Sequence, residues 1–278
     1  MSSAPTTAPA RARAPVSHVG PPARGGRALA PPRRASAPRP ALSLVFPVRD
    51  EERNVGPLID AALAVATQLA PDFELVVVDD GSRDGSAALL DARRSKEPRL
   101  RVLTHPANRG YGAALRTGLR AARGELVFFS DADLQFELAE LEALLALAGS
   151  CDVVAGYRAP RRDPWPRRAL AFGWGTCVRL LFGLPVRDID CAFKVFHRRV
   201  LEAIPIASIG AFVNTEILVR AQSLGFRIRE VPVSHRPRVH GRQSGARPRV
   251  ILRALLELAT LYRELRRTPP VRHAGAPR

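Results

Sequence analysis

Five apolar runs in the middle of the chain are typical of buried β-strands. They span residues 42–48, 73–79, 100–104, 125–130 and 152–157. The segments between them place apolar residues at helical spacing and predict helices. These predicted helices span residues 51–69, 86–94, 112–123 and 137–148. Strands that are apolar throughout and alternate with helices indicate a mostly parallel sheet with helices on both faces, so the predicted fold class is α/β.

The two ends of the chain differ from this central part. Residues 1–40 contain prolines throughout, seven arginines and no acidic residue, which predicts a disordered basic tail. Near the other end, residues 249–266 predict a basic amphipathic helix. Its apolar stripe is predicted to consist of Ile251, Leu255, Leu258, Tyr262 and Leu265. We therefore divide the chain into a tail (1–40), one α/β domain (41–246) and an amphipathic helix with a short basic tail (247–278).

Composition narrows the class of protein. The formal net charge is +17, but Lys96 and Lys194 are the only lysines, and arginine, alanine and proline are abundant together. A GC-rich coding sequence explains part of this charge, so a polyanionic partner does not follow from it. Cys151, Cys177 and Cys191 fit neither a disulfide framework nor a zinc pattern, which favours a reducing cytosol. We expect no membrane-spanning helix, which needs roughly 18–20 apolar residues, and no secretory signal.

Acidic residues follow three of the predicted strands. They are Glu51 after the first strand, Asp79 and Asp80 after the second, and Asp131 and Asp133 after the fourth. Because the carboxyl ends of parallel strands share one edge of a sheet, these clusters should converge where such sheets bind ligands. Together with Gln135, the last cluster offers oxygen donors that suit Mg²⁺ or Mn²⁺ rather than zinc. Substrate phosphates usually complete such a metal site, so we expect a nucleoside diphosphate beside it.

Several longer stretches resemble a known family. They are SLVFPVRDEERNV, VVVDDGSRDGS, NRGYGAALRTGLRAARGELVFFSDADLQ, VRDIDCAFKVFHRRVL and NTEILVRAQSLGFRIREVPVSHRPRVHGRQSG. Over about residues 42–250 the chain is similar to the family 2 glycosyltransferases of the GT-A (Rossmann-like) fold. Within them it most resembles the dolichol- or polyprenyl-phosphate sugar transferases. The resemblance implies an inverting, metal-dependent enzyme that moves a hexose from a GDP-mannose or UDP-glucose type of donor to a polyprenyl or dolichyl phosphate.

The resemblance also implies where the donor binds. The expected nucleotide-binding residues are Pro47 (through its backbone), Glu51, Asp80 and Asp131. The expected ligands of Mg²⁺ or Mn²⁺ are Asp131, Asp133 and Gln135. Asp79 is expected to be structural. Family members commonly carry Tyr-Asn where this chain has Arg49-Asp50, which leaves the identity of the base open.

On the acceptor side, the resemblance implies phosphate contacts at Arg158, Arg167 and Arg238. Arginine suits this role because its guanidinium grips phosphate oxygens bidentately. The expected catalytic residues are Asp133, at the metal, and Asp188. A phosphate acceptor is already an anion and needs no strong base, whereas a hydroxyl acceptor would need Asp188 or Asp190.

Alternatives remain open at this stage. The same donor chemistry could serve a hydroxyl acceptor on a glycan or a small molecule. From a different class, a basic nucleic-acid-binding protein would show steeply salt-dependent binding, but the acidic cluster would repel a phosphate backbone, so we expect no nucleic-acid partner. The glycines of NRGYG (residues 108–112) either permit a tight turn or cradle a phosphate.

A strongly apolar segment over residues 169–184 follows a cluster of arginines. It is too short to span a bilayer and predicts either a buried helix or a helix in the membrane interface. Together with the basic amphipathic helix it indicates contact with an anionic membrane surface or with a membrane partner protein. We therefore expect a cytoplasmic protein, peripheral on the inner face of the cell membrane, whose ligands are a nucleotide sugar and a polyprenyl phosphate lipid.

Overall fold

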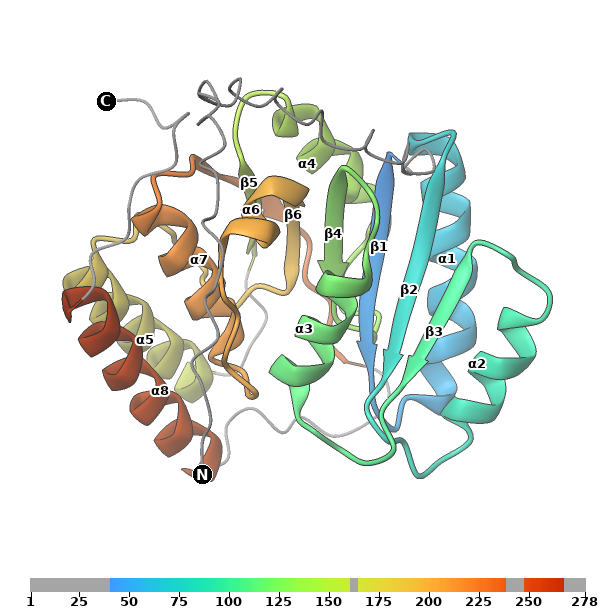
Figure 1. Ribbon diagram of the computed structural model, residues 1–278, viewed down its shortest axis with the longest axis horizontal. Helices are drawn as coiled ribbons and strands as arrows, with labels where there is room; N and C mark the ends of the chain where they lie inside the picture. The colour runs from blue at the N-terminus through green and yellow to red at the C-terminus, as the bar shows by residue number, and fades with distance from the viewer. Residues whose placement is uncertain (1–40, 161–164, 239–247, 268–278) are drawn as a thin grey trace, which may run out of the picture. The chain divides into compact units, whose positions relative to one another are not determined.

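A seven-stranded sheet underlies the predicted domain (Figure 1). The computed structural model describes residues 41–160, 165–238 and 248–267. The strands are β1 (Leu42–Val48), β2 (Phe73–Asp79), β3 (Leu100–Thr104), β4 (Leu126–Ser130), β5 (Val153–Arg158), β6 (Phe193–His197) and β7 (Ile228–Val233). All residues of β1 and β2 are buried, including the polar Ser43, Glu74 and Asp79 among their mostly apolar side chains. The tail predicted over residues 1–40 lies outside the described residues.

The order of the strands fixes where a ligand would bind. It is β3-β2-β1-β4-β6-β5-β7, and neighbouring strands run parallel except at β6, which is antiparallel to β4 and β5. From β1 the chain continues to β2 on one side, and β4 later joins β1 on the other side. Ligands of such sheets bind outside the carboxyl ends of the strands, at the point where the strand order reverses. The predicted mostly parallel α/β sheet is confirmed, and its switch point lies between β1 and β4.

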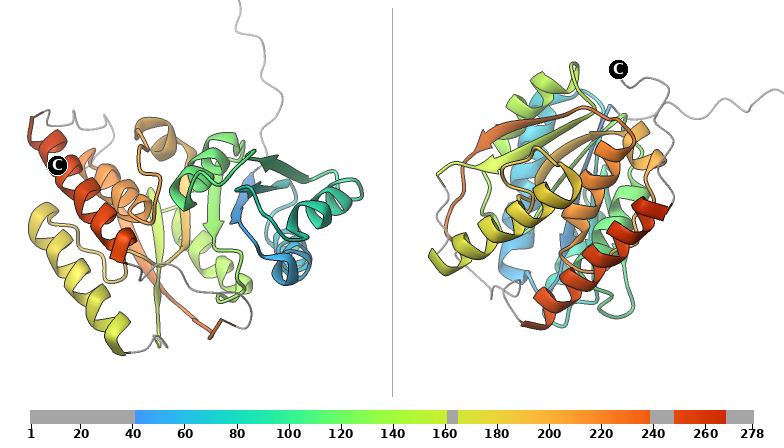
Figure 2. Two further views of the ribbon diagram at one scale, coloured as in Figure 1. Left: turned by 90° about the horizontal axis from the view of Figure 1, so that it is seen from below. Right: turned by 90° about the vertical axis from the view of Figure 1, so that its left-hand side faces the viewer.

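Helices cover the sheet. They are α1 (Glu52–Leu69), α2 (Ser86–Arg94), α3 (Tyr111–Ala121), the 3-10 turn η1 (Leu138–Glu140), α4 (Leu141–Ala148), α5 (Trp165–Phe182), α6 (Arg198–Ala203), α7 (Val213–Ser223) and α8 (Pro248–Arg267). Figure 2 shows α3 on the opposite face of the sheet from α1. The reversal of strand order requires this, because right-handed crossovers in opposite directions place their helices on opposite faces.

The sequence predicted the first five strands and the first three helices to within two residues at each end, and the fourth predicted helix, 137–148, is observed as η1 followed by α4. It did not predict β6, β7, α6 or α7. Lys194, the second residue of β6, is 1% exposed and interrupts the apolar residues of this strand. Its ammonium group donates hydrogen bonds to the carbonyls of Ile189 (3.1 Å) and Cys191 and to Oδ1 of Asn214 (3.2 Å). A buried charge is tolerated there because its donors are satisfied by oxygen atoms.

The predicted C-terminal amphipathic helix is present as α8. Leu258 and Leu261 are buried against the domain, whereas Leu255 of the predicted apolar stripe is 47% exposed. Arg220 of α7 anchors the helix through two 2.8 Å hydrogen bonds to the carboxylate of Glu264. Within the described parts of the chain, no helix is both long enough and apolar enough to cross a membrane.

Candidate active site

The carboxyl ends of β1 and β4 bring Glu51, Asp131 and Asp133 to one edge of the sheet. Glu51 precedes α1, and its backbone N–H donates to Oγ of Ser86 (3.0 Å), which fixes the chain at the strand-to-helix turn. Asp131 and Asp133 follow β4 directly and enter a turn in which Leu134 has a φ of 57°. The predicted convergence of the acidic clusters that follow the first and fourth strands is therefore present in the structure.

Asp131 and Asp133 form an electrostatically unfavourable pair. Burial and the neighbouring charge of Asp133 raise the pKa of Asp131 to about 7, although the nearby Tyr111 hydroxyl and the charges of Lys194 and Arg158 oppose this change. Oδ1 of Asp131 is buried and receives no hydrogen bond of normal geometry from the described residues. A buried carboxylate oxygen without a donor, beside a second carboxylate, is suited to a cation.

Arg238 bridges the two strand ends. Its Nη2 contacts Oε1 of Glu51 in a close ion pair, and its Nη1 lies 3.4 Å from Oδ2 of Asp133. The side chain of Arg238 is 16% exposed, and those of its two partners are 11% and 9% exposed. The structure thus places a residue predicted for the acceptor phosphate between two residues predicted for the donor and the metal.

Gln135 holds the segment that carries this arginine. Its Nε2 donates to the carbonyl of Arg236 (2.9 Å), and the N–H of Arg236 donates to the carbonyl of Gln135 (2.7 Å). An antiparallel bridge between Phe136 and His235 continues the pairing. The predicted metal ligand Gln135 therefore has its amide nitrogen engaged, which leaves the amide oxygen as the atom that a metal would use.

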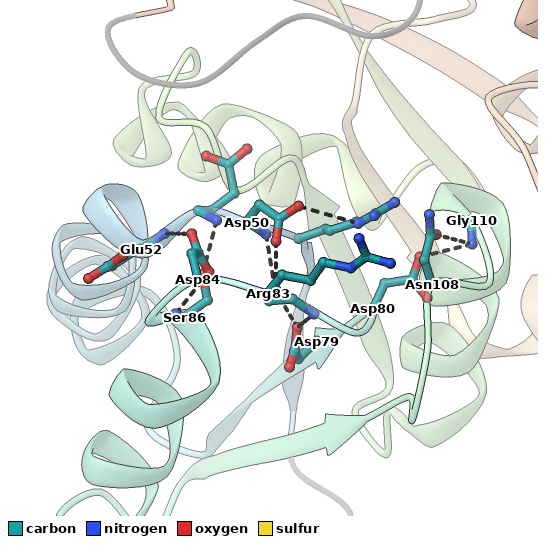
Figure 3. Close-up of polar contacts among 12 residues, drawn as sticks. Asp50, Glu52, Asp79, Asp80, Arg83, Asp84, Ser86, Asn108 and Gly110 are labelled. Carbon is teal, nitrogen blue, oxygen red and sulfur yellow. Dashed lines mark hydrogen bonds and ion pairs between the residues drawn. The ribbon is translucent and has the colours of Figure 1, made fainter.

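Asp80, predicted to contact the nucleotide, is 3% exposed and organises the loop after β3. Its two carboxylate oxygens accept the N–H groups of Arg109 and Gly110, each at 2.8 Å, and Oδ1 lies 2.7 Å from Nδ1 of His105. Figure 3 shows Asp80 facing this loop beside Asn108. Contact with a nucleotide stays a prediction for Asp80, whereas its role in shaping the loop is visible.

The glycines of this loop permit close packing. A Cβ atom on Gly112 would lie 2.6 Å from the carbonyl oxygen of Gly210 and 2.7 Å from that of Ser208. Gly110 has a φ of 100°, which L side chains rarely adopt. Of the two interpretations of NRGYG, these contacts support the tight turn.

The Arg49-Asp50 pair keeps the turn after β1 in shape. Asp50 has a φ of 53°, a conformation that Asn and Asp tolerate better than other non-glycine residues. Its carboxylate accepts the N–H of Arg83 (2.8 Å; Figure 3), and its own N–H donates to Oγ of Ser82 (3.0 Å). Asp in place of the family's Asn is therefore compatible with the conformation of this turn, and Arg49 beside it is the less conservative change.

Arg158 and Asp188 are paired with each other. Nε and Nη2 of Arg158 donate to Oδ2 (2.6 Å) and Oδ1 (2.8 Å) of Asp188, and both side chains are less than 10% exposed (7% and 8%). A carboxylate held in this way is poorly placed to accept a proton from an alcohol. The roles predicted for Asp188 as a base and for Arg158 as a phosphate ligand both require this pair to open or to act as a unit.

Two further predicted residues have simpler positions. Pro47 lies in β1 opposite Val78 of β2 and is buried. Arg167 lies in α5, but its side chain is outside the described part of the structure. Among the described residues, no three His, Cys, Asp or Glu side chains are already arranged as a metal-binding group.

Comparison with known proteins identifies the family. The sequence model described as "Glycosyl transferase family 2" matches residues 43–204. The chain belongs to this family. The matched region contains every element from β1 to β6, together with Glu51, Asp131 and Asp133. The glycosyltransferase domain that the motifs predicted is confirmed.

Among curated proteins, this family 2 chain is similar to the undecaprenyl-phosphate 4-deoxy-4-formamido-L-arabinose transferase of Aeromonas hydrophila. The two are 32% identical over 202 residues, which cover 72% of this chain and 61% of the relative. A protein of the same name from Pseudomonas fluorescens is 33% identical over 224 residues, which cover 79% of this chain and 64% of the relative. The chain thus spans less than two thirds of the length of these curated relatives.

A solved structure confirms the predicted GT-A fold class. Mannosyl-3-phosphoglycerate synthase from Rubrobacter xylanophilus gives a TM-score of 0.64 at 21% identity, over 86% of this chain and 79% of that one. Glucosyl-3-phosphoglycerate synthase from Mycobacterium tuberculosis, in complex with Mn²⁺ and UDP, gives a TM-score of 0.59 at 21% identity, over 85% of this chain and 82% of that one. At these identities the likeness is one of fold.

Sequence reasoning missed two groups at the site. Lys194 was visible only as one of two lysines in an arginine-rich chain, and nothing in its neighbours shows that it is buried beside Asp131. The second is the bridge from Arg238 to Glu51, whose members are 187 residues apart along the chain. No local pattern signals a contact of that range.

Proposed function

We propose that this protein transfers a sugar from a nucleotide sugar to a polyprenyl phosphate. The observation that carries the proposal is the pair Asp131 and Asp133 at the β1/β4 switch point, with one buried carboxylate oxygen that receives no hydrogen bond of normal geometry from the described residues. Such a pair favours a cation and, through it, a diphosphate. The proposed donor is of the GDP-mannose or UDP-glucose type. The Aeromonas relative is named for a formamido-arabinose, so the sugar itself is the part to determine by experiment.

The donor set fits Mg²⁺ or Mn²⁺. Carboxylate oxygens of Asp131 and Asp133 and the amide oxygen of Gln135 are hard ligands, and such ions take one or two carboxylates and complete their shell with water and substrate phosphates. Such an ion can therefore bind without three acidic or His side chains from the protein. When bound, the ion would neutralise the charge that develops on the departing nucleoside diphosphate. The binding of Mn²⁺ and UDP to the M. tuberculosis synthase supports this assignment.

The protein's own residues would position the two substrates. Glu51 and the loop held by Asp80 would flank the nucleotide at the carboxyl edge of the sheet. The acceptor would attack the anomeric carbon from the side opposite the leaving group, which inverts the configuration. Because Asp188 is tied to Arg158 by two short hydrogen bonds, we favour an acceptor that needs no deprotonation, and a phosphate monoester meets this condition.

The apolar surface of α5 and α8 supports a peripheral membrane location. The two helices lie side by side (Figures 1 and 2) and contact each other through Phe182 and Tyr262, whose ring centroids are 5.9 Å apart. The most exposed large apolar side chains on the pair, at 60–82%, are Trp165, Phe172, Leu180, Leu252 and Leu256. We propose that this face contacts the inner surface of the cell membrane, where the lipid acceptor would be found. A membrane partner protein is the alternative occupant of the same face.

The test is transfer of radiolabelled sugar into an organic-extractable product. Purified protein is incubated with Mg²⁺ or Mn²⁺ and undecaprenyl phosphate, with GDP-mannose and UDP-glucose supplied separately. We expect label in the organic phase that EDTA abolishes. If nucleotide sugar binds with metal but no label reaches the lipid, the acceptor is wrong and a hydroxyl acceptor replaces it. Arg158→Lys serves as the acceptor-side variant, for which we expect lower turnover with unchanged donor affinity.

A further inference from the structure

We propose that Arg238 is the internal counter-cation of the donor site: in the ligand-free protein its guanidinium occupies the place between Glu51 and Asp133 that a divalent metal and diphosphate must enter. Donor binding therefore displaces Arg238, and the released guanidinium becomes available for a second anion at the same edge. This inference rests on the proposed function, because it assumes that the donor binds at Asp131 and Asp133.

The contacts of Arg238 support this position. One guanidinium group reaches carboxylates that follow two different strands, Glu51 after β1 and Asp133 after β4. The two acids flank the switch point of the sheet, so the arginine spans the location where ligands of α/β sheets bind. Glu51 is additionally held by Nδ2 of Asn54 (2.5 Å), and Asp133 by the N–H of Gln135 (3.3 Å). The two carboxylates are therefore kept in place while the guanidinium lies between them.

Burial makes this bridge stronger than an ordinary surface ion pair. All three side chains are at most 16% exposed, so water screens their charges poorly. Without Arg238, the carboxylates of Glu51 and Asp133 would lose the cation that they share in partly dehydrated surroundings, which is unfavourable. A divalent ion offers more charge to the same oxygens, so metal and arginine compete for one location. Binding of either one lowers the affinity for the other by the same factor.

The backbone that carries Arg238 does not need to move for this exchange. Two hydrogen bonds between Gln135 and Arg236 fix the segment two residues before it against the turn that bears Asp133. Rotation about the side-chain bonds is sufficient to free the guanidinium. Because its release follows donor binding, we infer an order of addition in which metal and nucleotide sugar precede the acceptor phosphate.

The test compares Mn²⁺ binding to the wild-type protein, Arg238→Gln and Arg236→Gln by titration calorimetry at a saturating concentration of UDP or GDP. Arg236 is a matched control, because it lies on the same segment but pairs with Glu137 at the surface. If Arg238 occupies the site about nine times in ten, its removal raises the apparent affinity for Mn²⁺ about tenfold. We expect this gain in Arg238→Gln and a change of less than about twofold in Arg236→Gln. Equal or weaker Mn²⁺ binding in Arg238→Gln would overturn the inference.

A second measurement separates this inference from the proposed function. Unfolding midpoints are measured for Arg238→Gln, Glu51→Gln and the double variant in EDTA, where donor binding plays no part. A bridge that exists in the free protein makes the two changes non-additive, whereas additive changes contradict it. If the double-mutant cycle shows coupling between Arg238 and Glu51 but the wild-type protein binds neither UDP nor GDP with Mn²⁺, the Arg238–Glu51 ion pair stands as a structural contact. The proposed function then fails for these donors, and with it the competition between Arg238 and the metal.

Discussion

Replacing Asp131 with asparagine should stabilise the metal-free protein, although the residue is predicted to be essential for donor binding. Burial and the charge of Asp133 raise the pKa of Asp131 from its ordinary value of 3.8 to about 7 in the folded protein. Folding therefore favours the protonated form. Well below pH 4 the group is protonated in both states, and its shifted pKa does not change the free energy of unfolding. As the pH rises from about 4 to about 7, the unfolded chain releases the proton first, so the free energy of unfolding falls. Above about pH 7 both states are ionised, and the whole loss of stability remains.

The magnitude follows from the same values. At about 1.4 kcal/mol for each pKa unit, the loss of stability approaches about 4 kcal/mol at pH 8 and is about 2 kcal/mol at pH 5. The asparagine side chain has almost the same shape as that of Asp131 and carries no charge. We expect Asp131→Asn to be more stable than the wild type, and its advantage at pH 8 to exceed that at pH 5 by roughly 2–3 kcal/mol. Any change in packing is common to both pH values and cancels in this difference.

The assay is urea unfolding of both proteins in EDTA at pH 5 and pH 8, followed by circular dichroism. Asp91→Asn, a change at an exposed carboxylate on α2, serves as the control and should show little dependence on pH. Mn²⁺-dependent nucleotide binding should be lost in Asp131→Asn at either pH. An advantage that does not grow with pH, or a loss of stability at pH 8, would show that Asp131 is not held in an unfavourable ionised state.

Three further predictions follow from packing, pairing and exposure. Gly112→Ala should lower the free energy of unfolding by about 1–3 kcal/mol, because its Cβ would lie 2.6 Å from a backbone carbonyl oxygen. Gly149→Ala is the control and should be neutral, since its Cβ would have nothing within 4 Å. Equal effects of the two changes in urea unfolding would contradict this reasoning. Asp188→Asn should lower the free energy of unfolding by about 3 kcal/mol, because it removes one partner of the buried ion pair with Arg158. Asp60→Asn, at an exposed ion pair, should lower it by less than about 1 kcal/mol. A small effect at Asp188 would show that its ion pair is not formed. Leu180→Glu, at an 82% exposed position on α5, should reduce co-sedimentation with anionic vesicles without shifting the unfolding midpoint. Unchanged co-sedimentation would exclude the exposed apolar face of α5 and α8 as the membrane contact.

The predictable part of the fold is the part in which apolar runs end sharply at polar residues. β1 and β2 are seven-residue strands of mostly apolar sequence, and their observed limits coincide with the predicted ones. β6, whose sequence is FKVFH, was not predicted; like β2 it has a charged residue at its second position, but it is two residues shorter. Only the three-dimensional arrangement of Ile189, Cys191 and Asn214 shows that this charge is satisfied. Tertiary context overrides local pattern here, as it often does for short strands.

The candidate site divides in a similar way. Strand order alone predicts that Glu51, Asp131 and Asp133 share an edge, because parallel strands align their carboxyl ends. The partners of Asp80 and Arg238 depend on loops whose paths no periodicity encodes. Asp80 is largely engaged by the loop after β3, and Arg238 lies across the donor carboxylates. The sequence motifs thus predicted the candidate residues, and the structure adds the contacts that hold Asp80 and Arg238 in place.

Nucleotide binding with and without metal tests the proposed donor site most directly. UDP and GDP are titrated into the wild-type protein and into Asp133→Asn, first with Mn²⁺ and then with EDTA. We predict that at least one nucleotide binds the wild type in Mn²⁺, that EDTA abolishes this binding, and that Asp133→Asn weakens it at least about tenfold, as expected for loss of a charged ligand worth over about 1.4 kcal/mol. Binding that is equally tight in EDTA and in Asp133→Asn would contradict a metal-bridged nucleotide at the carboxyl ends of β1 and β4.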